Sequence, residues 1–231
     1  GLFLIIIVVF FSGELVWRDR MFHIEEVMNA TPHSTFASVI AKVASLVAAA
    51  TLLQLVFIAM GILSQLLRGY TAIELDVYLI DLFVDTLPGF IVFAALFVFI
   101  QTLMNNRYIG YFASILFYIV WGIVVNGVFE WQTNMVLPGA TPGIFYSDMS
   151  GFGPGMNGTL WFNAYWLLFA LILLAKAALF WPRSSVSGFK EKFRSGMSNF
   201  SGSYRTGMIA LGAVWIAVGG WVFYNTQILN P

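Results

Sequence analysis

Apolar residues occur in long runs separated by short polar segments, and the length of the runs predicts membrane-spanning helices. Five runs cover residues 36–67, 77–104, 109–129, 160–181 and 206–224. A helix needs about 20 mostly apolar residues to cross a bilayer. Backbone polar groups in lipid must be bonded within the segment, so runs of this length favour helices over barrel strands. The pattern predicts an all-α, polytopic transmembrane helix bundle.

A sixth, shorter apolar run, GLFLIIIVVFF, opens the sequence. Its length of about eleven residues is too short to cross a bilayer. It also lacks the basic region and the small-residue cleavage site of a signal peptide. We interpret residues 1–12 as the end of a truncated span. We therefore expect residues 1–231 to be one permease-like membrane domain and a fragment of a longer chain.

Composition supports this class and removes several others. The chain is 60% hydrophobic and 10% charged, whereas soluble domains carry about 25% charged residues. The absence of cysteine excludes disulfides, cysteine-ligated zinc and thiol nucleophiles. The net charge is zero, so no general attraction to nucleic acid follows. Because charge is scarce, its placement is informative.

The basic residues predict the orientation of the chain. Alternating crossings put residues 12–35, 105–108 and 182–205 on one side, and residues 68–76 and 130–158 with the chain's end on the other. The first side carries eight basic residues: Arg18, Arg20, Arg107, Arg183, Lys190, Lys192, Arg194 and Arg205. The second carries Arg68 alone. Since Lys and Arg accumulate in cytoplasmic loops, we expect residues 13–35 and 182–205 to be cytoplasmic and the C-terminus to be extracytoplasmic.

The polar segment after the first run predicts an interfacial amphipathic helix over residues 14–28. Its apolar residues follow helical spacing and form one stripe: Trp17, Met21, Ile24 and Met28. Glu14 and Arg18 make a favourable i,i+4 pair, and Thr31-Pro32 fits the N-cap and first residue of the next helix. Its acidic residues favour a protein partner over anionic lipid. From the residues alone, a simple interfacial connector is an equal alternative.

Few ionisable residues lie inside the predicted spans. Asp81 and Asp85 are one turn apart near the outer end of the second long run, where they could line an aqueous cavity or form an interfacial polar face. Lys176 lies about two turns from a cytoplasmic end, where it can snorkel. The spans contain no catalytic constellation, the sequence has no nucleotide-binding G-x-x-x-x-G-K-[ST] motif, and we expect no metal site or cofactor in this segment.

The order Glu14, Arg18/Arg20, Glu25, Ala30-Thr31-Pro32 and then Lys42 resembles the signature of ABC-type exporter permeases of the second (ABC-2) class. The resemblance implies a coupling helix that sits in a cleft of a cytoplasmic ATP-binding subunit. It also implies a bacterial inner (plasma) membrane location and a second permease half or a homodimer. Lys42 would be an interfacial anchor. The implied ATPase-coupling surface comprises Glu14, Arg18, Arg20, Glu25, Glu26, Thr31 and Pro32.

A closer likeness rests on four separated motifs: GELVWRDR, NATP, LLRGYTAIELDVYLIDLF and TPGIFYSDMSGFG. Together they are similar to large permeases fused to a C-terminal gluzincin-type zinc aminopeptidase. This sequence contains no His-Glu-x-x-His, so the zinc and any peptidase activity would lie beyond Pro231. An alternative is a membrane anchor or scaffold subunit that transports nothing.

Overall fold

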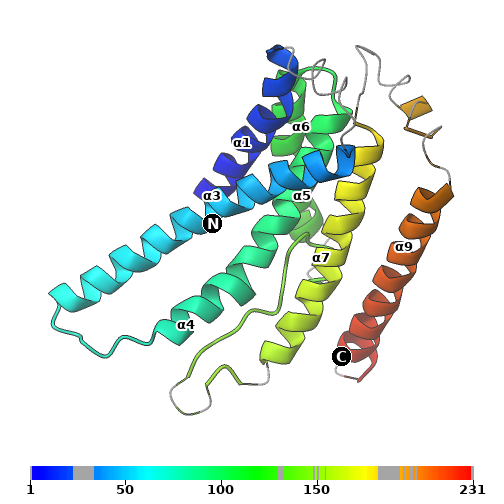
Figure 1. Ribbon diagram of the computed structural model, residues 1–231. Coiled ribbons are helices and arrows are strands. Elements are labelled where there is room, and N and C mark those ends of the chain that lie inside the picture. Colours follow the sequence, from blue (N-terminus) through cyan, green and yellow to red (C-terminus); the bar gives the residue numbers. More distant parts are fainter. Residues whose placement is uncertain are drawn as a thin grey trace.

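The computed structural model describes residues 2–22, 34–128, 133–147, 149, 151–153, 155–181, 193–194, 196–197, 200 and 202–229. Helices dominate this part of the chain (Figure 1). The α-helices are α1 (Leu2–Met21), α3 (Thr35–Leu67), α4 (Leu75–Ile80), α5 (Leu87–Leu103), α6 (Arg107–Ile119), α7 (Gly155–Leu179) and α9 (Gly202–Phe223). Three π-helical segments extend them: η1 (Asp81–Thr86), η2 (Val120–Val128) and η3 (Tyr224–Leu229). Because η1 joins α4 to α5, residues 75–103 form one continuous helix.

Four helices are long and apolar enough to cross a membrane: Thr35–Leu67, Leu75–Leu103, Gly155–Leu179 and Tyr204–Leu229. They confirm four of the five predicted spans. The fifth, 109–129, corresponds to α6 with η2, whose described apolar part, Arg107–Ile123, is shorter than a full span. The chain is therefore a multi-pass helical membrane protein.

The first helix corrects the predicted division of the N-terminal region. No break separates residues 1–12 from the charged segment, since α1 runs through Ser12 and Gly13 to Met21. Ser12 donates its hydroxyl hydrogen bond to the Val9 carbonyl within the same helix, 2.8 Å away. Gly13 is needed there because a Cβ would lie 2.1 Å from Cε1 of Tyr111. Residues 14–21 are thus the last two turns of α1, not the start of a separate interfacial helix.

Several helix ends lie together at each end of the bundle. In Figure 1 the ends of α1 and α7 and the start of α6 lie together, and the turn from α3 to α4 lies at the opposite end. Contacts agree with the view: the Arg107 guanidinium approaches Met21 Sδ at 3.1 Å, and the Tyr204 hydroxyl donates to the Ala175 carbonyl.

Helix α5 forms the centre of the bundle. It packs against α7, α1, α3 and α6, and Phe97 and Val98 are fully buried in a core shared with α1, α3 and α7. Small side chains at Ala94 and Ala95 allow neighbouring helices to approach closely. By contrast, the half of α3 beyond Ala50 contributes no buried residue and leaves the other helices (Figure 1).

Candidate functional site

A half-buried lysine joins three helices at the α1–α6 end of the bundle. Lys42, two turns into α3, donates from Nζ to Oδ2 of Asp19 at 2.5 Å and to the Leu15 carbonyl at 2.8 Å. Its ammonium also lies 5.8 Å from the ring centroid of Trp181, just after α7. The Lys42 and Asp19 side chains are only 13% and 18% exposed. We call this group the Lys42 junction; a charge so poorly hydrated requires such partners.

A second polar contact lies beside the junction. The Trp17 indole donates to Oε1 of Gln101 on α5, 2.9 Å away and fully buried. Gly110 of α6 makes room for this amide, since a Cβ there would lie 2.0 Å from the same oxygen. The Gln101 Nε2 has no hydrogen-bond partner in the described part of the chain. Apolar surroundings make each polar contact of this kind costly to lose.

Only part of the predicted coupling surface lies in the described residues. The Glu14 and Arg18 side chains are exposed on α1, on the same two turns that supply Leu15 and Asp19 to the junction. Nothing is described for the Arg20 side chain or for the four remaining members: Glu25, Glu26, Thr31 and Pro32. Of the predicted apolar stripe, Ile24 and Met28 also lie outside the described residues. Trp17 of the same stripe is buried, and Met21 is exposed.

Sequence reasoning singled out Lys42 but missed Asp19 and Gln101. Asp19 was one of several charges within a short segment, and nothing distinguished it from its neighbours. Gln101 had a detectable signal, because it is the one strongly polar side chain between Leu87 and Leu103 other than Thr102. An amide in an otherwise apolar span indicates an interhelical hydrogen bond.

The two predicted span aspartates lie on η1 at the opposite end of the bundle. Asp81 is exposed, and Asp85 is half-buried. In the same turn the Asn163 amide donates to the Val84 carbonyl at 2.6 Å. Neither of the two pockets described next is lined by these aspartates, so a cavity-lining role stays a prediction.

Residues 133–143 fold back against the spans near these aspartates. The Trp121 indole donates to the Val136 carbonyl. The Trp166 indole donates to the carbonyls of residues 134 and 140. The Thr159 hydroxyl donates to the Gly143 carbonyl. These distances are 2.8–3.2 Å. The spans therefore satisfy four carbonyls of a segment without regular structure, as backbone near a membrane requires.

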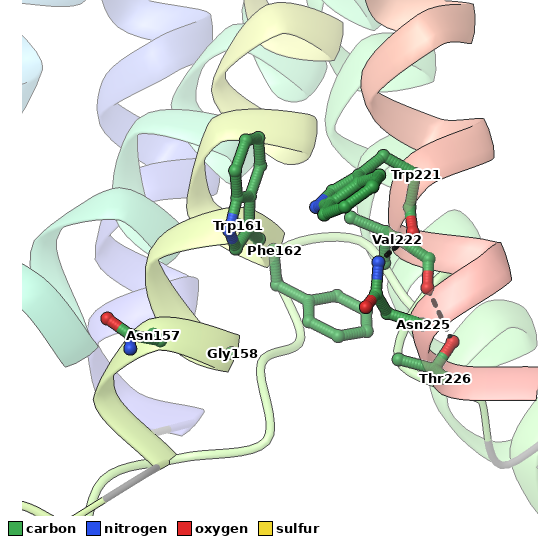
Figure 2. A pocket seen from close by; sticks show the side chains of 8 residues that line it. All are labelled: Asn157, Gly158, Trp161, Phe162, Trp221, Val222, Asn225 and Thr226. Atoms are coloured by element: carbon green, nitrogen blue, oxygen red, sulfur yellow. Dashed lines mark hydrogen bonds between the residues drawn. The ribbon is translucent and has the colours of Figure 1, made fainter. Parts of the chain in front are cut away.

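Two apolar pockets lie in the described part of the chain. One, of about 160 Å³, is lined mainly by aromatic residues of α5, α6 and η2. The other, of about 240 Å³, lies between α7 and the end of α9 and is shown in Figure 2. No charged residue lines either pocket.

Within the described residues, no three His, Cys, Asp or Glu side chains form a group that could hold a metal ion. The polar contacts at the α1–α6 end join α1 to α3 and α1 to α5. Comparison with known proteins found no matching family model, no similar curated sequence and no similar solved structure.

Proposed function

We propose that this chain is the membrane-spanning permease part of an ATP-driven ABC-type exporter, coupled to a cytoplasmic ATP-binding subunit through residues 14–31. The Lys42 junction carries the proposal. It connects the helix surface bearing Glu14 and Arg18, two members of the motif, with the next span. A coupling element needs such a connection, because movement imposed at the surface must reach the spans.

The proposed path has two branches. Displacement of residues 14–21 would move Asp19 and the Leu15 carbonyl, and through Lys42 it would tilt α3. The same displacement would move Trp17 and, through Gln101, the central helix α5. The subunit that hydrolyses ATP would thus change the packing of two spans without contacting either.

The finer part of the proposal follows from the resemblance to permeases fused to a zinc aminopeptidase. In that arrangement the chain would continue into an extracytoplasmic peptidase domain, and the zinc would be held there. Such an exporter would act as a homodimer or with a second permease half, in a bacterial inner membrane.

The test uses the full natural chain, purified with its ATP-hydrolysing subunit into lipid nanodiscs. Glu14→Arg and Arg18→Glu should each lower the ATPase activity that co-purifies with the chain. Each should also lower the stimulation of ATP hydrolysis by the membrane-spanning chain. Glu74→Arg is the matched control, because Glu74 is exposed at the opposite end of the bundle. Lys42→Met should retain the ATPase subunit but weaken the stimulation.

The exporter proposal fails if an ATPase never co-purifies stoichiometrically, or if both charge reversals leave hydrolysis unchanged. Purification with extracytoplasmic partners alone would instead favour a non-transporting anchor or scaffold. Thermal unfolding of each variant shows whether a loss reflects coupling or misfolding.

A further inference from the structure

The pocket between α7 and α9 is built from two helices that face lipid. Helix α9 contacts the bundle through α7: the rings of Tyr165 and Trp215 stack at 5.3 Å, and a Cβ on Gly219 would lie 3.0 Å from Tyr165. One turn nearer the helix ends, Trp161 and Trp221 approach with centroids 6.0 Å apart. Both indoles are about half exposed, so the pocket opens sideways toward the bilayer.

The interior of this pocket is mostly apolar, although three of its lining residues have polar side chains: Asn157, Asn225 and Thr226. Phe162 and Val222 form its floor and are 4% and 2% exposed. Figure 2 shows the Asn225 and Thr226 side chains turned back to their own helix: Asn225 Nδ2 donates to the Trp221 carbonyl at 2.8 Å, and Thr226 Oγ1 donates to the Val222 carbonyl at 2.9 Å. The Thr226 hydroxyl hydrogen and one amide hydrogen of Asn225 are thus used within the helix.

Size and charge then restrict the occupant. A volume of about 240 Å³ is below the roughly 300–1,000 Å³ of pockets that enclose a whole small molecule. An uncharged lining offers nothing to an ionic solute. The polar side chains Asn157, Asn225 and Thr226 lie nearer the helix ends than Trp161 and Trp221. The pocket is therefore polar at the end nearer the membrane surface and aromatic at its inner end, which matches a ligand with one hydrated and one apolar end.

We propose that the α7–α9 pocket binds one acyl chain of a membrane phospholipid, with its glycerol ester groups at the outer end of the pocket, beside Asn225 and Thr226, and the chain directed inward past Trp161 and Trp221. The lipid belongs to the leaflet at the end of the bundle opposite the Lys42 junction. It fills the space between α9 and the other helices and fixes the position of α9. The proposal stands independently of the exporter function.

The experiment places the full chain in phosphatidylcholine nanodiscs containing a small fraction of a phosphatidylcholine with a diazirine on one acyl chain. After photolysis, mass spectrometry maps the labelled peptides. Labelling at residues 157–162 and 221–226 should exceed, by severalfold, that at residues 52–57 of α3, which are exposed to bulk lipid.

Thr226→Phe should fill the pocket and abolish the excess. The matched control Gln227→Phe lies on the exposed side of η3 and should preserve it.

Trp221→Ala gives a second test, because it removes a half-exposed wall of the pocket but no buried side chain; it should also reduce the excess. Equal labelling at the pocket and at residues 52–57 would mean ordinary boundary lipid and would overturn the proposal. An excess that persists in Thr226→Phe, in a variant with unchanged thermal unfolding, would overturn it as well.

Discussion

Helices α5 and α3 have nearly the same mean hydropathy but opposite environments. In the helix that contains α5, 44% of the residues in its most apolar stretch are buried. In the most apolar stretch of α3, 11% of the residues are buried. Hydropathy measures the preference for leaving water, and lipid satisfies that preference as well as protein does. The difference lies instead in close contacts, such as those of Gln101 and Ala94, that α3 lacks beyond Ala50.

The largest effect should separate two phenylalanines. Phe97→Ala on α5 removes a fully buried ring and should lower the free energy of unfolding by about 3–5 kcal/mol. Phe57→Ala on α3 removes a ring that is 55% exposed and should change it by less than about 0.5 kcal/mol. Reversible unfolding in mixed micelles measures both. Equal losses would mean that the outer half of α3 is also packed against protein.

A smaller effect should separate two lysines. Lys42→Met leaves the Asp19 carboxylate without its cation and should cost roughly 2 kcal/mol, less than a fully buried pair because both side chains retain some exposure. Lys176→Met alters an exposed side chain and should be close to neutral. Addition of Asp19→Asn to Lys42→Met should recover part of the loss. If it recovers nothing, the Asp19 carboxylate left without its cation is not the cause of the loss.

The smallest effect concerns two helical glycines. Gly110→Ala forces Gln101 away and should break its bond to Trp17, at a cost of about 1 kcal/mol. Gly61→Ala on α3 meets nothing within 4 Å and should be neutral or stabilising by up to about 1 kcal/mol, because alanine favours helix. Unfolding midpoints in the same micelles compare them. A destabilised Gly61→Ala would contradict the open surroundings of α3.

The same contrast explains what the sequence could predict. Helix type and the approximate ends of four spans follow from run length and from the backbone's need for internal bonds. The break expected after residue 12 was wrong, because a change from apolar to charged residues marks a change of solvent and need not interrupt backbone bonding. Ser12 and Gly13 lie within the continuous helix, where Ser12 bonds to the Val9 carbonyl and Gly13 makes room for Tyr111.

The candidate site was only partly accessible to sequence reasoning. Lys42 was identified through its spacing from a motif, but its partners Asp19 and Leu15 are set by how α1 crosses α3. That crossing depends on side-chain packing among four helices, which no local pattern encodes. The α7–α9 pocket was missed for the same reason: it arises where two spans meet, and Trp161 alone reads as an interfacial residue.

Packing of α5 against α7, its most extensive helix contact, sets an order for assembly in the membrane. During synthesis α5 enters the bilayer before α7 has been made. Lipid therefore first covers Phe97 and Val98, which are buried in the core of the finished bundle. The carbonyls of residues 134 and 140 must also wait for Trp166. The bundle can therefore close only after α7 inserts.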